Sequence, residues 1–154
     1  MTELTFEGAL VYLPGERIET SVTVLDGVIE AIGGPALGKV IDARGLILAP
    51  ALIDVHGDAF ERQVMPRPGV FFPMETAVLE TERQLAANGI ATTYHSITLG
   101  YEPGLRSVER GREMMQAIRD LAPRLTVENR VQLRWETFAF EALNTLAWAM
   151  DAPL

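Results

Sequence analysis

The stretch ALIDVHGDAF, residues 51–60, decides how the fold is interpreted. It begins as a nearly continuous apolar run, which is typical of a strand that is buried on both faces of a sheet. It ends in His56 and Asp58, which stand two residues apart. Side chains alternate along a strand, so these two point to the same side if the backbone stays extended. An imidazole and a carboxylate on one side can hold a divalent ion such as zinc.

Downstream of this stretch, strands and helices are expected to alternate. Gly89 stands where a glycine would end a helix, and residues 60–73, with three prolines, are expected to form an irregular loop. A βαβαβα order predicts a parallel sheet with helical crossovers. The strands are expected over 51–55, 90–97 and 131–138, and the helices over 75–88, 105–121 and 140–150.

Upstream of this stretch, the chain reads as short strands and turns. Asp26-Gly27 lies between two apolar stretches, which predicts a β-hairpin. We therefore expect two parts, a small sandwich-like β part over residues 1–48 and an α/β part over residues 49–154.

Composition narrows the classes of function. The chain has 154 residues, of which 48% are hydrophobic, so we expect a globular fold with a core. The net charge of −8 argues against a nucleic-acid surface but not against a small anionic ligand. Cysteine is absent, which excludes disulfides, thiolate metal sites and a cysteine nucleophile. No signal peptide and no apolar run of about 18 residues is visible, so the expected location is the cytoplasm, away from membranes.

Polar residues stand at all three expected strand ends, where parallel α/β folds gather their reactive groups. The first end carries Asp54 besides His56 and Asp58, the second carries His95, and the third carries Arg134 and Glu136. Buried charge is costly unless it is paired or bound to metal, so this coincidence favours a site. Glu136 could add a third ligand, an oxygen, to His56 and Asp58 of the first strand.

Each of these residues also has an ordinary structural interpretation. His56 could be a hydrogen-bonded histidine at a strand end, with the acids around it solvated. His95 could be a buried histidine with its hydrogen bonds satisfied, and Arg134 could pair with a carboxylate. Arg67 stands between two prolines that stiffen its backbone, which suits a phosphate contact, although residue type alone favours an ordinary surface loop arginine.

Three segments of the chain resemble the amidohydrolase superfamily. They are GLILAPALIDVHGDAFERQVMPRPGVFFP (residues 45–73), AANGIATTYHSITLG (residues 86–100) and LRWE (residues 133–136). The first is similar to the superfamily's first barrel strand. The superfamily pattern there is HxH, and Asp58 in the second position resembles the branch that acts on a ribose 5-triphosphate in the carbon–phosphorus lyase pathway.

The resemblance implies a fold and a chemistry. It implies a small β-sandwich part followed by the first three βα units of a TIM-barrel-like domain, which is then an incomplete barrel. It implies a metal-dependent hydrolase of phosphonate catabolism, in which a metal-activated water attacks a phosphoryl group and releases pyrophosphate. The cofactor would be one or two divalent ions, with zinc expected, and the partner a phosphorylated small molecule.

The resemblance also implies roles for residues. His56 and Asp58 match metal-ligand positions, Glu136 is expected as a further ligand or bridging carboxylate, and Arg67 as a phosphate contact. His95 and Arg134 are expected to contact substrate, although the resemblance supplies no firm role for His95.

Two other functions remain open. One is a different amidohydrolase that cleaves a C–N bond of a cyclic amide or N-acyl substrate. The other is a truncated, non-catalytic chain that binds or assembles with a partner. The later-strand histidines and the aspartate that complete the superfamily's site are not in this sequence, so we expect the chain to be an N-terminal fragment that is inactive alone. A homo-oligomer or a missing C-terminal half of the barrel would be its partner.

Overall fold

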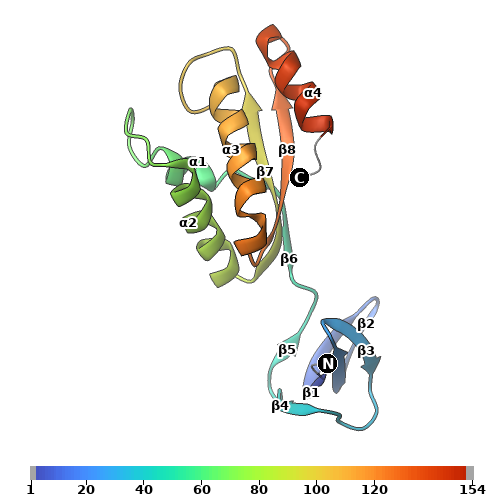
Figure 1. The fold of residues 1–154 in the computed structure, drawn as a ribbon. Coiled ribbons are helices and arrows are strands. Elements are labelled where there is room, and N and C mark those ends of the chain that lie inside the picture. Colours follow the sequence, from blue (N-terminus) through green and yellow to red (C-terminus); the bar gives the residue numbers. More distant parts are fainter. Residues whose placement is uncertain (1–2, 152–154) are drawn as a thin grey trace. The chain divides into compact units, whose positions relative to one another are not determined.

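The computed structural model describes residues 3–151 and divides into two compact units, one ending at Pro50 and one starting at Ala51 (Figure 1). Each unit has its own sheet and its own cluster of buried apolar side chains. The fold is mixed α/β, which confirms the class expected from the sequence.

The first unit contains a five-stranded sheet. Its strands are β1 (Glu3–Leu13), β2 (Glu16–Leu25), β3 (Val28–Ile32), β4 (Lys39–Asp42) and β5 (Ile47–Leu48). Strands β1 to β3 pair antiparallel, whereas β4 and β5 run parallel to successive parts of β1. The sequence predicts a sandwich-like part, but the strands of residues 3–50 join in one sheet, because the long β1 pairs with both β4 and β5.

The hairpin between β2 and β3 is confirmed. Asp26 and Gly27 have φ angles of 48° and 84°, the left-handed values that a tight two-residue turn needs. Glycine takes such a value without strain, and aspartate tolerates it better than most residues.

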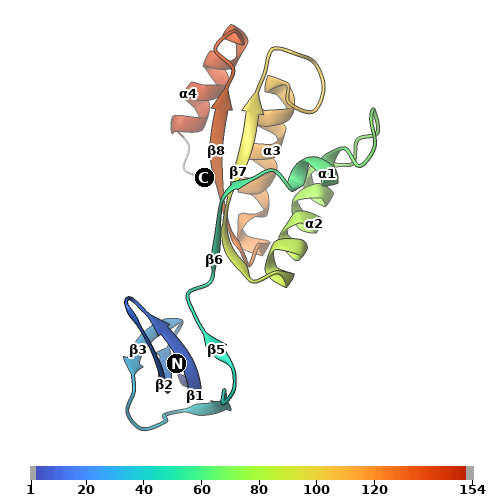
Figure 2. The same ribbon diagram turned by 180° about the vertical axis from the view of Figure 1, so that it is seen from behind.

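The second unit contains a three-stranded parallel sheet in the order β6-β7-β8, which confirms the predicted parallel sheet with helical crossovers (Figure 2). The strands are β6 (Leu52–Gly57), β7 (Ile90–Leu99) and β8 (Glu128–Trp135). The helices are α1 (Phe60–Val64), α2 (Met74–Ala87), α3 (Val108–Leu121) and α4 (Leu143–Asp151), with 3₁₀ turns η1 (Ala122–Arg124) and η2 (Phe140–Ala142).

Three expected elements of this unit need correction. The loop expected over 60–73 begins with the short helix α1. The second long helix starts at Val108 rather than 105, because the Ser107 side chain accepts a hydrogen bond from the Arg110 backbone N–H and caps it. The third strand lies three residues earlier than expected, at Glu128–Trp135, because its backbone pairs with β7 from Thr92 onward.

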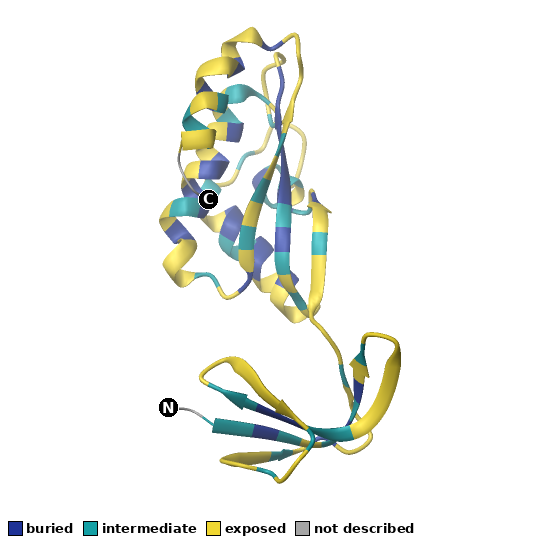
Figure 3. Ribbon diagram, turned by 90° about the vertical axis from the view of Figure 1, so that its right-hand side faces the viewer, coloured by how far each residue is buried: buried dark blue, intermediate teal, exposed yellow. Residues whose placement is uncertain are grey.

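The core of the second unit lies between the sheet and the helices, since α2 and α3 both pack on β7. Alternate residues of β7 face this core, with Ile97 and Leu99 almost fully buried. The opposite face of the sheet carries no helix or strand of the second unit among residues 51–151 (Figure 3).

Strand β6 is therefore not buried on both faces, which corrects the expectation from its apolar run. Leu52 and Ile53 are each 61% exposed and Val55 is 65% exposed. The sequence pattern describes a strand with cover on two sides, whereas helices cover only one side of this sheet.

Candidate functional site

The carboxyl ends of three parallel strands lie at the same end of the second unit's sheet. His56 is the next-to-last residue of β6, and Asp58 follows that strand directly. Glu136 follows β8, and Gly100 follows β7. The topology thus places the three predicted metal ligands, His56, Asp58 and Glu136, at the same end of the sheet, with β7 between their two strands.

The end of β6 is shaped by backbone hydrogen bonds. The His56 N–H donates to Asp54 Oδ1 at 3.0 Å, and the Asp58 carbonyl accepts from Glu61 N–H at 3.0 Å where α1 begins. The side chains of His56 and Asp58 are exposed. They are therefore accessible for binding.

Glu136 is held against the end of β7. Its N–H donates to the Leu99 carbonyl at 3.2 Å, which extends the β7–β8 pairing by one residue. A Cβ on Gly100 would lie 2.9 Å from Glu136 Oε2 and 3.1 Å from the Arg106 carbonyl oxygen. The glycine at this position therefore lets the Glu136 carboxylate approach the backbone that follows β7.

An arginine pairs with a carboxylate at this same end. Arg106 Nε and Nη2 donate to the two oxygens of Glu61 at 2.8 and 2.9 Å, a bidentate pair between the β7–α3 loop and α1. The hydrogen bond to Glu61 raises the pKa of Arg106, and the charges of Asp58 and Glu136 act in the same direction. Three carboxylates thus act on one guanidinium.

Sequence reasoning missed this ion pair. It assigned no role to Glu61 or to Arg106. The available signal was local, since Arg106 directly precedes the capping residue Ser107 in the loop after the second parallel strand. Strand-to-helix loops at this end are where parallel α/β folds place ligand contacts.

A hollow of about 540 Å³ lies beside the ion pair. Its lining includes Glu61, Arg106 and Glu136 together with Gly100 and Tyr101. The predicted contacts Arg67 and Arg134 are not among its lining residues. Both arginines are exposed. Arg67 lies in a turn in which the Val70 N–H donates to the Arg67 carbonyl at 3.0 Å, and Arg134 lies on β8.

The candidate ligands do not close around an ion. Within residues 3–151, no group of three His, Asp or Glu side chains is arranged to hold a metal. The chemistry of His56, Asp58 and Glu136 suits zinc, but their side chains supply at most part of a coordination set. Any complete set would need further ligands or a rearrangement at the strand ends.

His95 lies away from solvent, on the helix-facing side of β7. It is 2% exposed, its Nε2 lies 2.6 Å from Asn129 Oδ1, and the ring of Phe60 meets it edge-on. Burial lowers the pKa of His95, which outweighs the hydrogen bond to Asn129. This geometry favours the buried, hydrogen-bonded histidine over the substrate contact.

Behind His95, a buried carboxylate organises the start of β8. Glu82 of α2 accepts hydrogen bonds from the backbone N–H groups of Thr126 and Val127 and from Asn129 Nδ2. Asn129 therefore bridges Glu82 and His95. The chain Glu82–Asn129–His95 ties α2, β8 and β7 together.

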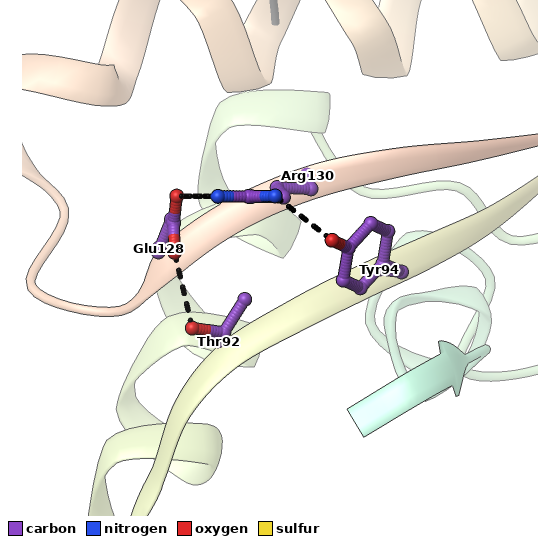
Figure 4. A network of polar contacts seen from close by, with 4 residues as sticks. All are labelled: Thr92, Tyr94, Glu128 and Arg130. Carbon is purple, nitrogen blue, oxygen red and sulfur yellow. Dashed lines mark hydrogen bonds and ion pairs between the residues drawn. The ribbon is translucent and has the colours of Figure 1, made fainter. Parts of the chain in front are cut away.

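The open face of the sheet carries a ladder of polar pairs between β7 and β8 (Figure 4). Arg130 pairs with Glu128 and donates to the Tyr94 hydroxyl at 2.9 Å, and Thr92 donates to Glu128 at 3.1 Å. Further along, Ser96 donates to Gln132 at 2.8 Å. Polar residues thus continue along this face toward the strand ends.

The chain is similar in sequence to three named enzymes. The chain is 30% identical over 129 residues to the α-D-ribose 1-methylphosphonate 5-triphosphate diphosphatase of Escherichia coli K12, which covers 80% of this chain and 34% of that protein. It is 32% identical over 113 residues to the allantoinase of Bacillus licheniformis, covering 72% and 24%. It is 34% identical over 92 residues to the dihydroorotase of Lactobacillus helveticus, covering 59% and 20%.

Comparison with solved structures gives a match over nearly the whole chain. A crystal structure of D-hydantoinase matches 99% of this chain and 31% of its own, with a TM-score of 0.63 and 17% identity, which shows likeness of fold. No protein-family model matches the chain. The chain spans about a third or less of the length of these relatives. No described helix is long and apolar enough to cross a membrane.

Proposed function

We propose, from the premise that this chain belongs to the amidohydrolase superfamily, that it supplies the first strand ends of the active centre of a metal-dependent hydrolase. The observation that carries the proposal is the position of His56, Asp58 and Glu136 at the carboxyl ends of parallel strands. That end is where such folds carry out chemistry.

The second unit would be the first three βα units of a TIM-like barrel. Two features support this: β6, β7 and β8 are parallel and adjacent in chain order, and the core lies on one face of the sheet. The open face with its exposed apolar residues on β6 would then be the barrel interior. The first unit would be the small β domain that accompanies the barrel.

The cofactor would be a divalent ion, zinc in our proposal, as one or two ions. His56 and Asp58 would be ligands and Glu136 a further ligand or bridge, and other ligands would complete the set. A bound ion would lower the pKa of a water molecule and polarise the scissile group. Arg67 and Arg134 remain proposed contacts for a phosphorylated substrate.

The proposed reaction is cleavage of a phosphoric anhydride in a ribose 5-triphosphate, with release of pyrophosphate. The E. coli diphosphatase supports it, because that alignment covers 80% of the chain, and so does Asp58 in place of the superfamily histidine. A second candidate is hydrolysis of a cyclic C–N bond. The relatives named allantoinase and dihydroorotase support this alternative.

The test begins with the intact mass of the protein in its source cells, compared with the 16.9 kDa of this chain. The form found there is loaded with Zn²⁺ or Mn²⁺ and assayed for pyrophosphate release from ribose 5-triphosphates and for ring opening of cyclic amides. Variants His56→Ala and Asp58→Asn are expected to lose at least about a hundredfold in rate, because each removes a metal ligand. The control is Arg124→Gln, an exposed arginine in η1.

Pyrophosphate release would support the diphosphatase, and ring opening the second candidate. Metal-independent rates, or rates unchanged in His56→Ala and Asp58→Asn, would contradict the proposal.

A further inference from the structure

We infer that Arg106 is a substrate-positioning residue that binds an anionic group, phosphate or carboxylate, of the substrate. The inference rests on the proposed function for the location of the active centre, and it adds the class of substrate. Three features of Arg106 support it. Its backbone position is fixed, only two of its three guanidinium nitrogens donate to Glu61, and its side chain lines the hollow.

The backbone fixes Arg106 at the end of β7. Its carbonyl accepts the Gly100 N–H at 2.8 Å, and Gly100 and Ser107 form a parallel bridge. Ser107 then caps α3. These backbone contacts hold the two ends of the loop from Gly100 to Arg106 together, so the backbone position of Arg106 is fixed beside the end of β7.

Glu61 orients the Arg106 guanidinium but leaves some of its N–H donors available for a ligand. The carboxylate takes Nε and Nη2, while Nη1 has no hydrogen-bond partner among residues 3–151. The Arg106 side chain is 52% exposed, against 18% for Glu61. Solvent screens the exposed Arg106 end of this pair, so its contribution to stability is small and its main effect is to hold the guanidinium donors in one orientation.

The hollow beside this fork gives an anion access to it. Arg106 is the only Lys or Arg among the lining residues in the part of the chain that the structure describes. A planar guanidinium with a free edge binds phosphate or carboxylate through charge-assisted hydrogen bonds. Arg67 and Arg134 are exposed as well, but no carboxylate among the described residues orients either of them.

The negative charge around Arg106 disfavours the binding of an anion. Asp58, Glu61 and Glu136 act on Arg106 and oppose an incoming anion. A divalent cation offsets that repulsion, so anion binding is expected to be tighter in its presence. Arg106 would then contact an anion that also needs the cation.

The test measures binding and turnover separately. Pyrophosphate and succinate, the probes for phosphate and carboxylate, are titrated calorimetrically into the protein with and without Mg²⁺. Arg106→Gln is expected to weaken binding of at least one probe about tenfold or more, and Arg106→Lys by less, because lysine keeps the charge but loses the fork. The matched control Arg124→Gln is expected to change binding less than about twofold, because Arg124 is exposed and is not among the residues that line the hollow.

Weakening for pyrophosphate alone would assign phosphate, and weakening for succinate alone would assign carboxylate. Equal binding by the original protein and Arg106→Gln, or no binding of either probe, would overturn the inference. A fall in melting temperature of Arg106→Gln by more than a few degrees would also overturn it, since the ion pair would then be structural.

Turnover separates this inference from the proposed function. Hydrolysis with a KM that Arg106→Gln leaves unchanged would reject the inference alone. Anion binding that depends on Arg106, without hydrolysis of any substrate, would reject the proposed reaction alone.

Discussion

At the scale of single residues, burial decides the behaviour of His95. Its ring is 2% exposed, and burial lowers its pKa from the usual 6.5. Below pH 6.5 the unfolded chain takes up a proton that the folded chain resists, so unfolding is favoured as the pH falls. We predict that the free energy of unfolding decreases as the pH falls through 6.5, with a slope that approaches about 1.4 kcal/mol per pH unit below that value.

The measurement is urea unfolding followed by circular dichroism between pH 7.5 and 5.5. His95→Gln should flatten the slope while keeping a partner for Asn129. An identical slope in His95→Gln and the original protein would contradict the prediction.

Glu82 is a buried carboxylate that holds the start of β8, so its removal is expected to lower stability. Glu82→Ala leaves the Thr126 and Val127 N–H groups without their acceptor, and it removes one of the two acceptors of Asn129 Nδ2, which also donates to the Val127 carbonyl. We expect a loss of about 3 kcal/mol in the free energy of unfolding, because buried donors without partners are costly. Glu80→Ala on the same helix, which removes a 3.5 Å exposed pair with Arg83, should cost about 0.5 kcal/mol or less. Similar losses in the two variants would refute the assigned role of Glu82.

At the scale of elements, close packing of α3 on β7 depends on Gly111. A Cβ there would lie 2.5 Å from Leu99 Cδ2 and 3.2 Å from the Thr98 carbonyl oxygen. Alanine is the better helix former by about 1 kcal/mol, but overpacking a full core costs roughly 1–3 kcal/mol. Gly111→Ala is therefore expected to destabilise the protein, by about 1 kcal/mol in urea unfolding. The exposed Gln116→Ala should stay within about 0.5 kcal/mol, and a more stable Gly111→Ala would show that the core has room.

The elements that could be predicted are those with local signals. The hairpin at Asp26-Gly27 and the end of α2, which Gly89 follows after the C-cap Asn88, are marked by residues that their backbone needs. The start of β8 could not be predicted, because pairing with β7 sets it and the polar residues at Glu128 and Arg130 hide it. Helix α1 has five residues and no side-chain cap, so no local pattern marks it.

The candidate site divides in the same way. The alternation of chain elements predicts that His56, Asp58 and Glu136 reach one end of a parallel sheet, and the structure agrees. It does not predict the pair Arg106–Glu61, which joins residues 45 positions apart through a loop and a short helix. Nor does it predict that His95 turns inward, because one residue of register along a strand decides the face.

At the scale of the whole molecule, the uncovered face and edge of β6 are the main liability. Three apolar side chains, Leu52, Ile53 and Val55, are each more than 60% exposed on one strand. Apolar strand edges associate with one another, so we predict that this chain sediments as concentration-dependent oligomers. The double variant Ile53→Thr and Val55→Thr keeps strand propensity and should shift it toward monomer.

Sedimentation velocity over a range of concentrations measures this association. Leu37→Thr, which removes an exposed apolar side chain that lies outside the strands, is the control and should leave the association unchanged. A chain that stays monomeric at all concentrations would contradict the prediction.

Both tryptophans of the chain lie in the second unit, so tryptophan fluorescence reports on that unit and not on the first. Trp135 donates from its indole nitrogen to the Ala139 carbonyl at 3.0 Å, and Trp148 lies beside the guanidinium groups of Arg112 and Arg119 at 4.6 and 4.5 Å. Residues 1–50 contain no tryptophan. Indole emission therefore reports only on the unit that carries the candidate site, and both fluorophores sit on its last strand and last helix. The protein thus carries a native optical label, with which melting of this unit can be followed separately from the β unit and without an attached dye.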